Sequence, residues 1–528
     1  MEMERLNKKR TALIIIGAMI GILLASLDSN IVGTAMPKII GSLRGFDLYT
    51  WPITAYLLTM TISMPLFGKL ADVYGFKPVY LFGIIVFLIG SVLCGLSQNM
   101  MPFILFRGLQ GIGGAILISN TLAIIGIMFP PAERAKYGGF VSSASGLASL
   151  VGPFLGGLIT DNFSWRWVFF VNIPLGVIAL AIFIFAFPAY KEKREHKPVD
   201  FAGAAVMIVA LVPMLLAFTW GGRNYGWNSI QIIGLLVFSV IMLVVFGMIE
   251  TKVKDPIIPM SLFKNAIFDF SAVEMFLLNI VLMASIIFIP LFLQGVKGSS
   301  ASGSGAIITP MLVSIIVGVM ACGMVVSKTC KYKAMSVAGF LIMGASALML
   351  SFWNVNTGNT QVVIAMIIMG LGIGVVMAIF NVTAQNVFPE NQMGTVTSSI
   401  QFFGRMGQTI AASVLGTVLS TSMSKSFLSL DVSKFPSQLA QQLKDTNTIS
   451  SADAISSIKA QIPASLLPDF EKLVIQIKQI LSNSIHQIFV ICVAVILVAL
   501  ITLLFMKEVP LSKKKEREET GKDIEEVR

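Results

Sequence analysis

Long apolar runs separated by short polar loops make up most of the chain. A helix of about 20 apolar residues spans the core of a bilayer, whereas a membrane strand alternates in polarity over about ten residues. The pattern therefore predicts an all-α integral membrane protein. Fourteen predicted transmembrane helices lie near residues 12–36, 51–70, 79–98, 102–127, 138–160, 167–188, 201–220, 229–249, 267–293, 303–326, 335–353, 361–385, 397–420 and 484–506.

Two polar interruptions break the even spacing of these helices. Six helices precede the first interruption, at 190–200, and two helices and then a second block of six follow it. The second interruption separates the last two helices. We therefore divide the chain into an N-terminal six-helix bundle at 1–190, two additional linker helices at 191–255, a C-terminal six-helix bundle at 256–506 with an insertion at 421–483, and a basic tail at 507–528.

The insertion at 421–483 is rich in Ser, Gln and Lys. After Pro468, apolar residues such as Phe470, Leu473 and Ile477 recur at three- and four-residue steps, which predicts an amphipathic helix that continues into the last span. The insertion forms either an extracellular hairpin or cap, or a lid or partner-docking element.

Charge and composition set the class and the orientation. Only 12% of the residues are charged and 55% are hydrophobic, which excludes a soluble globular protein. Basic residues gather in the loops after the even-numbered helices, such as Lys77, Arg134 and the run 191–197, so the positive-inside rule predicts that both termini are cytoplasmic. The net charge of +11 includes the basic tail, from which we expect attraction to the membrane surface and no nucleic-acid binding.

Catalytic and metal-binding patterns are missing from the sequence. No CxxC pair joins the four cysteines, and His196 and His486 lie in different kinds of segment without a carboxylate cluster. The sequence therefore predicts no metal site and no disulfide framework, and we do not expect an enzyme. Glycine-rich strings lie inside apolar helices rather than in a strand–helix unit, which argues against a nucleotide-binding loop.

A single carboxylate, Asp28, interrupts the first predicted helix. A charge at the bilayer centre costs about 2.5 to 3.5 kcal/mol on insertion scales, so an intramembrane Asp usually faces a cavity or a partner. Asp28 is therefore a candidate functional residue. The alternative is that it anchors the outer end of its helix at the lipid headgroups.

Two motifs follow in the next helices. The string GKLADVYGFKPV contains Gly68, Asp72, Gly75 and Lys77, and it combines small residues for close helix contact with charges for the cytoplasmic loop. The string RGLQGIGGAI begins at Arg107 near the outer end of the fourth helix. Its small residues let helix backbones touch in lipid. Arg107 is a partner for Asp28 or, alternatively, an arginine that faces the headgroups.

The fifth helix carries ASLVGPFLGGLITD, with Gly152, Pro153, Gly156 and Gly157. Because Pro removes a helix hydrogen bond, we expect this helix to bend. The string WRWVFFVNIPLG from Trp165 then forms an aromatic belt at the start of the sixth helix.

Together with LDSNIVGTAMP around Asp28, these strings resemble the major facilitator superfamily, and specifically its fourteen-span drug:H+ antiporter family. The resemblance implies a major facilitator fold, in which two six-helix bundles rock about a central site, with two inserted helices. It implies proton coupling through Asp28 and Arg107, a gating motif at Gly68, Asp72, Gly75 and Lys77, and an antiporter motif at Gly152, Pro153, Gly156 and Gly157. It further implies a monomer in a bacterial plasma membrane that needs no cofactor beyond the proton gradient.

The sequence departs from the family pattern in three places. Asn30 and Gly33 replace the usual Thr and Asn near Asp28, and Ala148 replaces a frequent Gly. Val73 and Phe76 stand where the gating motif normally has basic residues, so we expect a weaker charge latch between the halves.

The second half offers Glu274 and Asp269 in the ninth helix and Arg405 in the thirteenth. Glu274 lies deeper in the membrane than Asp269 and is a candidate for a cationic substrate or a second proton, whereas Asp269 is expected at the interface. Arg405 could pair with a helix carbonyl or with an acid such as Glu274.

The leading hypothesis is a drug:H+ antiporter that exports amphipathic, cationic small molecules by alternating access. The alternatives are a dedicated exporter of an endogenous lipid or metabolite, and a membrane sensor or scaffold that kept the fold without transport. A scaffold has no need to bury Asp28 and Arg107, which argues against the last alternative.

Overall fold

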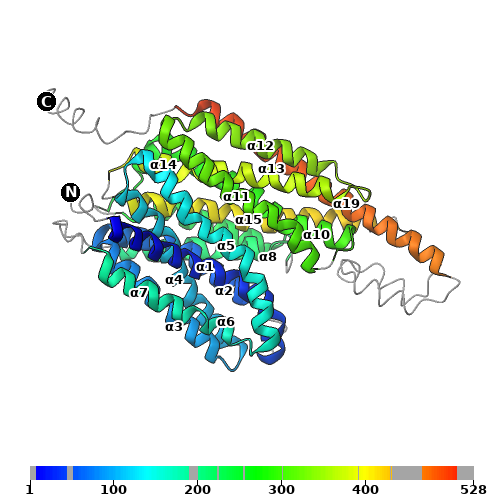
Figure 1. The fold of residues 1–528 in the computed structure, drawn as a ribbon, viewed down its shortest axis with the longest axis horizontal. Coiled ribbons are helices and arrows are strands. Elements are labelled where there is room, and N and C mark those ends of the chain that lie inside the picture. Colours follow the sequence, from blue (N-terminus) through cyan, green and yellow to red (C-terminus); the bar gives the residue numbers. More distant parts are fainter. Residues whose placement is uncertain are drawn as a thin grey trace.

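The structure is a computed structural model that describes residues 8–43, 51–188, 200–222, 225–253, 256–299, 301–389, 392–427, 430 and 466–507. Its described part consists almost entirely of helices that run roughly along one direction (Figure 1). The start of α1 and the end of α19 lie at the same end of the molecule. The tail 508–528 and most of the linker before 200 lie outside the described residues. What the sequence predicts for them stays a prediction.

The first seven helices pack against one another. They are α1 (Lys8–Leu43), α2 (Trp51–Tyr74), α3 (Phe76–Leu96), α4 (Met100–Met128), α5 (Pro131–Asn162), the short α6 (Trp167–Phe170) and α7 (Asn172–Ala186). In this group α4 packs on both α2 and α3, while α1 packs on α5 and α7. Asp28 and Arg107 both belong to this group.

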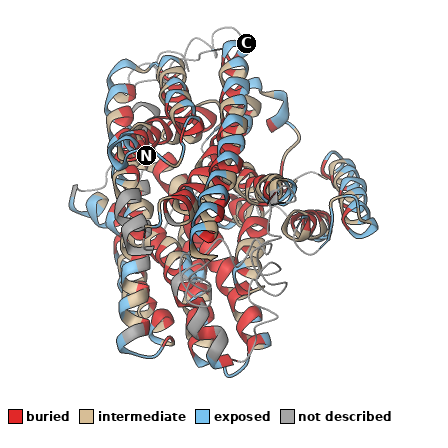
Figure 2. Cartoon of the chain, turned by 90° about the vertical axis from the view of Figure 1, so that its right-hand side faces the viewer, coloured by how far each residue is buried: buried red, intermediate tan, exposed pale blue. Residues whose placement is uncertain are grey.

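The second group of packed helices begins after residue 265. It contains α10 (Ala266–Leu291), α11 (Ala301–Thr329), α12 (Lys333–Ser351), α13 (Asn359–Met377), α14 (Phe380–Asn386), α15 (Met393–Phe427) and α19 (Leu467–Phe505). A 3₁₀ turn, η3 (Leu262–Lys264), precedes α10, and a π-helical turn, η4 (Phe292–Val296), follows it. A large apolar core joins these helices. Figure 2 shows that buried residues gather in the interior of the packed helices as a whole.

Twelve helical segments of the described chain are long and apolar enough to cross a membrane. They include α6 with α7 and α13 with α14, each taken as one continuous segment. The two remaining long helices, α5 and α15, have 32 and 35 residues but are less apolar. Both lie between the halves, where small and polar residues replace lipid-facing ones. The all-α membrane fold is confirmed, and the count of fourteen spans stays a prediction with which these helices are consistent.

The two halves meet along two helix pairs, α2 with α15 and α5 with α11. At the first pair, a Cβ atom on Gly68 would lie 2.6 Å from the carbonyl oxygen of Gly394. At the second, a Cβ atom on Gly139 would lie 2.5 Å from a methyl group of Val319. Glycine therefore sets how closely the halves approach.

The two additional helices, α8 (Phe201–Trp220) and α9 (Ile230–Glu250), form a hairpin at the periphery. α8 contacts α2 and α15, whereas α9 packs mainly on α8. α9 buries one narrow stripe of residues, Ile232, Ser239, Phe246 and Glu250. Its other faces are apolar and exposed, as expected for a helix that contacts lipid.

The last helix begins well before its predicted span, at Leu467. Phe470, Leu473, Ile477 and Leu481 are buried along one face, which confirms the predicted amphipathic extension. Ser482 donates a hydrogen bond to the carbonyl of Trp353 and fixes the extension to the second half. Most of the insertion, at 431–465, lies outside the described residues, so its lid or docking role stays a prediction.

Candidate functional site

Asp28 lies inside α1 and is completely buried. Its Oδ2 accepts a hydrogen bond from Arg107 Nη1 at 2.5 Å, and its Oδ1 accepts from Gln110 Nε2 at 2.8 Å and Asn172 Nδ2 at 3.0 Å. A buried carboxylate is tolerated only when it is paired and hydrogen-bonded. Asp28 therefore meets this condition with donors from α4 and α7.

Arg107 on α4 is 1% exposed and forms the other half of this ion pair. The same Nη1 also donates to Gln110 Oε1 at 2.7 Å, three residues along the helix. The Arg107 guanidinium lies 4.2 Å from the centre of the Tyr56 ring, and the Tyr56 hydroxyl donates to the carbonyl of Ala25. Neither charged side chain lies at the surface, which disfavours a headgroup role for either.

Ser91 on α3 completes the network around Asp28. Asn172 Nδ2 and Gln110 Nε2 lie 3.0 and 3.2 Å from Ser91 Oγ, which donates to the carbonyl of Phe169. Two polar atoms in the network, Arg107 Nε and Asn172 Oδ1, are buried without a hydrogen-bond partner. The network therefore joins α1, α3, α4 and α7 and retains unused hydrogen-bonding capacity beside the ion pair.

We did not predict a role for Gln110, Asn172, Ser91 or Tyr56 from the sequence. Each is a polar or aromatic residue inside an apolar run, which alone does not separate a ligand from a residue that only joins helices. The spacing of Gln110 from Arg107 was the available signal, because residues three apart share a helix face.

Close helix contacts bring this network together. A Cβ atom on Gly111 would lie 2.4 Å from the carbonyl oxygen of Tyr56, so only Gly lets α4 approach α2 here. On the other side of α1, a Cβ atom on Gly152 would lie 2.7 Å from the Cβ of Asn30. The antiporter motif therefore lies against α1 about half a turn beyond Asp28.

The remaining residues of that motif continue along α5. Gly156 is buried and its carbonyl accepts a hydrogen bond from Thr160, whereas Gly157 has open space beside it. The helix continues through Gly152 and Pro153 without interruption, so the bend expected at Pro153 stays a prediction.

The gating motif lies at the junction between the halves. Asp72, near the end of α2, accepts hydrogen bonds from the backbone N–H groups of Gly394 and Thr395 at 2.8 and 2.6 Å, and from the Thr395 hydroxyl at 2.8 Å. The N-terminal end of a helix carries a partial positive charge that favours a carboxylate. The first turn of α15 therefore binds Asp72 across the junction between the halves.

Gly75 and Lys77 lie at the turn from α2 to α3. Gly75 has φ of 96°, in the left-handed region that favours glycine. Lys77 Nζ donates to the carbonyls of Ile184 and Phe187 at 2.9 and 2.7 Å, at the end of α7. Lys77 therefore binds within its own half rather than across the junction.

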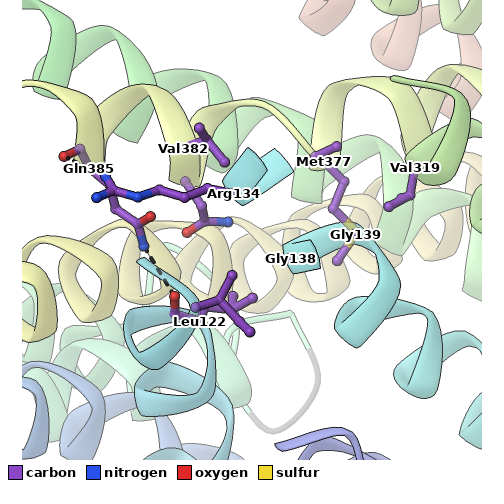
Figure 3. A pocket seen from close by; sticks show the side chains of 11 residues that line it. Leu122, Arg134, Gly138, Gly139, Val319, Met377, Val382 and Gln385 are labelled. Carbon is purple, nitrogen blue, oxygen red and sulfur yellow. Dashed lines mark hydrogen bonds between the residues drawn. The ribbon is translucent and has the colours of Figure 1, made fainter. Parts of the chain in front are cut away.

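A second contact closes the same end of the molecule. Arg134 on α5 is 2% exposed and donates to the carbonyls of Phe129 and Gln385. Gln385 on α14 donates to the carbonyl of Leu122 in the opposite half and to Thr397. Figure 3 shows Arg134 and Gln385 beside a small cavity whose lining comes from both halves. The halves are thus joined at the end that carries Asp72.

Glu274 on α10 is fully buried. Thr502 on α19 donates a hydrogen bond to its Oε1 at 2.5 Å. Its other oxygen, Oε2, is buried without a partner. Asp269 is half-buried in the first turn of α10, where a carboxylate suits the helix terminus, in line with an interfacial position.

Arg405 on α15 is half-buried and does not pair with Glu274. Its Nη1 donates to Gln408 Oε1 at 2.9 Å, and Gln408 Nε2 donates to Asn279 Oδ1 at 2.8 Å. The Arg107–Asp28 contact is a salt bridge between α4 and α1. Within the described ranges, no group of three or more His, Cys, Asp or Glu side chains could hold a metal ion.

Comparisons with known proteins agree with this architecture. A family model described as Major Facilitator Superfamily matches residues 18–412. Multidrug transporter protein MdtP of Bacillus subtilis (strain 168) is 38% identical over 99% of both chains. Multidrug resistance protein 3 of the same strain is 35% identical over 96% of this chain and 97% of its own. A solved structure, that of the human organic anion transporter MFSD10 (TETRAN), has the same fold, with a TM-score of 0.61 and 14% identity over 93% of this chain and 99% of that chain.

Proposed function

Because the chain belongs to the major facilitator superfamily, we propose that it is a proton-coupled multidrug exporter, a drug:H+ antiporter of a bacterial plasma membrane. The names of two relatives that cover nearly all of the chain, a multidrug transporter and a multidrug resistance protein, support the export of varied compounds. Both relatives come from a bacterium, which supports the proposed location.

The buried pair of Asp28 and Arg107 is the observation that carries proton coupling. Protonation of Asp28 would remove the negative charge and leave Arg107 as a buried, uncompensated cation. Breaking a buried pair in this way costs about 3 to 5 kcal/mol. A proton on Asp28 therefore favours a rearrangement that gives Arg107 another environment.

A path of contacts can carry such a rearrangement to the other half. Ser26 on α1 hydrogen-bonds Ser145 on α5 at 2.8 Å, and Gly152 on α5 touches Asn30 on α1. α5 in turn packs against α11, where a Cβ atom on Gly146 would lie 3.0 Å from Ile316. Movement of α1 relative to α4 would therefore act on one of the two helix pairs that join the halves.

Alternating access also requires the closed end to open. Opening would break the hydrogen bonds from Gly394 and Thr395 to Asp72, and the Arg134 contact with Gln385. We propose that this end is cytoplasmic, which makes the structure a state closed to the cytoplasm. Glu274 is the candidate for a second proton in this scheme.

The charge of the substrate is a separate question. The expectation of cationic compounds depends on carboxylates that face the substrate. Asp28 is paired with Arg107 and Glu274 packs against α19, so neither supports that expectation in this state.

The proposed function is tested with inverted membrane vesicles whose lumen is acidified. Two fluorescent probes are used, the cation ethidium and a neutral dansyl alkylamide. We expect the native protein to accumulate at least one of them, an uncoupler to abolish accumulation, and Asp28→Asn to do the same. Glu133→Gln, at an exposed acid in the first turn of α5, is the matched control and should transport normally. Accumulation that persists in Asp28→Asn would contradict proton coupling through Asp28.

A further inference from the structure

Arg405 faces the opposite half of the molecule. On α15, Gly394 and Ser398 touch Gly68 of α2, and Arg405 follows Ser398 by seven residues, or about two turns, on the same face. α2 leads back from this contact to Tyr56, twelve residues or about three turns before Gly68. In Figure 1, α15 runs through the middle of the molecule.

The charge of Arg405 is not compensated by the protein. Within the described part of the chain, no carboxylate lies within 4 Å of its guanidinium, and its single side-chain hydrogen bond goes to Gln408. Its Nε and Nη2 groups make no hydrogen bond to a described residue. Gln408 Nε2 donates a hydrogen bond to Asn279 Oδ1, which fixes the side-chain carbonyl of Gln408 that accepts from Arg405. Arg405 is thus a preoriented cation with unused donors.

Arg107 and Arg405 have opposite surroundings. Arg107 is fully buried and paired with Asp28, whereas Arg405 is half-buried and has no acid. A charged side chain inside a membrane protein normally has a partner or faces a substrate path. Asp28 already accepts hydrogen bonds from three side chains, Glu274 accepts one from Thr502, and neither acid pairs with Arg405 in this state.

We propose that Arg405 is an anion-binding subsite of the transport path, and that the exported compounds include amphipathic acids. An arginine fork with free N–H groups binds a carboxylate, sulfonate or phosphate oxygen pair through charge-assisted hydrogen bonds. This inference rests on the proposed function and names a substrate class for it.

The test uses three dansyl amphiphiles that share one alkyl chain and end in a sulfonate, a neutral amide or a trimethylammonium group. The sulfonate is permanently charged, so a pH gradient cannot redistribute it passively as a protonated acid. Each probe is measured with the native chain, Arg405→Gln, Arg405→Lys and the control Lys425→Gln, which changes an exposed cation at the outer end of the same helix.

Binding to purified protein in nanodiscs and uptake into inverted vesicles are both recorded. We expect Arg405→Gln to weaken sulfonate binding and uptake about tenfold or more, the effect of losing one charge-assisted contact, with the neutral amide nearly unchanged. Arg405→Lys should restore part of the loss because it keeps the charge without the fork. Lys425→Gln should behave as the native chain.

Two results would overturn the subsite. One is sulfonate binding in Arg405→Gln that equals that of the native chain. The other is an equal loss for all three probes in folded Arg405→Gln, which would make Arg405 a gating or structural residue. Failure of the proposed function is seen separately, as normal sulfonate binding by the native chain without proton-driven uptake of any probe.

Discussion

Asp72, two residues before the end of α2, accepts a 2.6 Å hydrogen bond from the backbone N–H of Thr395 in the first turn of α15. These residues belong to opposite halves and are 323 positions apart in the sequence. The carboxylate therefore lies near the C-terminal end of α2 and caps the N-terminal end of α15. Its hydrogen bonds to α15 must break before this end of the molecule can open.

Replacement of Asp72 by Asn should favour the open state. The amide keeps one acceptor but loses the charge that suits the helix terminus, a change of about 1 to 2 kcal/mol. The measurement is maleimide labelling of Ser398→Cys in inverted vesicles, in a chain whose four native cysteines are replaced. We expect labelling several-fold faster with Asp72→Asn than with the parent. Equal rates would show that Asp72 does not hold the halves together.

Gly68→Ala should disturb the same junction through volume rather than charge. Its Cβ would meet the Gly394 carbonyl at 2.6 Å and overlap the Ser398 hydroxyl, and such overpacking costs about 1 to 3 kcal/mol. We expect transport to fall about tenfold. Gly234→Ala, on the lipid-facing α9 with nothing within 4 Å, is the control and should be silent. Normal transport by Gly68→Ala would mean that the junction is looser than the contact implies.

Asn172→Ala removes one donor from Asp28 while Arg107 remains. Loss of a hydrogen bond to a buried charge costs about 1.5 to 3 kcal/mol, so proton-driven uptake should fall at least tenfold. Thermal unfolding of the purified protein is measured in parallel. A normal uptake rate in this variant would place Asn172 outside the coupling network.

Lys77 and Lys333 make equivalent contacts in the two halves, each with carbonyls at the C-terminal end of a helix. Lys77 binds the carbonyls at the end of α7, and Lys333 binds those of Leu504 and Met506 at the end of α19. A cation at a helix C-terminus contributes about 0.3 to 1 kcal/mol. We expect Lys77→Gln and Lys333→Gln to lower the unfolding temperature slightly and to leave transport within twofold. A transport defect specific to Lys77→Gln would restore its predicted gating role.

Glu274→Gln distinguishes a proton carrier from a structural acid. The amide can still accept from Thr502 but cannot bind and release a proton. If Glu274 carries a second proton, the variant should move fewer protons per substrate at unchanged substrate affinity. The ratio is measured from the gradient at which net transport reverses. An unchanged ratio would assign Glu274 to packing against α19.

The broad fold was predictable because lipid imposes long apolar helices with few exceptions. The exceptions are α5 and α15, which are less apolar than the other long helices because they lie where the halves meet. Asp28 and Arg107 were predictable as isolated charges. Gln110 and Asn172 were not, because a neutral polar residue in an apolar helix gives no sign of which charge it faces.

The second half was less predictable than the first. Sequence spacing left open a pair between Arg405 and Glu274, yet Glu274 turns to α19 while Arg405 lies on the face of α15 that meets α2. The neighbour that a side chain meets depends on how its helix is rotated and packed, which a single sequence does not specify. The same holds for Asp72, whose hydrogen-bond donors include two backbone N–H groups and a hydroxyl at the start of a distant helix.

In the proposed mechanism, Asp28 carries the proton that is exchanged for substrate. The most direct measurement is proton release from purified protein in weakly buffered detergent solution when the neutral dansyl amide is added. We expect the native chain to release about one proton per bound molecule and Asp28→Asn to release none. Equal proton release from the two proteins, at equal binding, would contradict it.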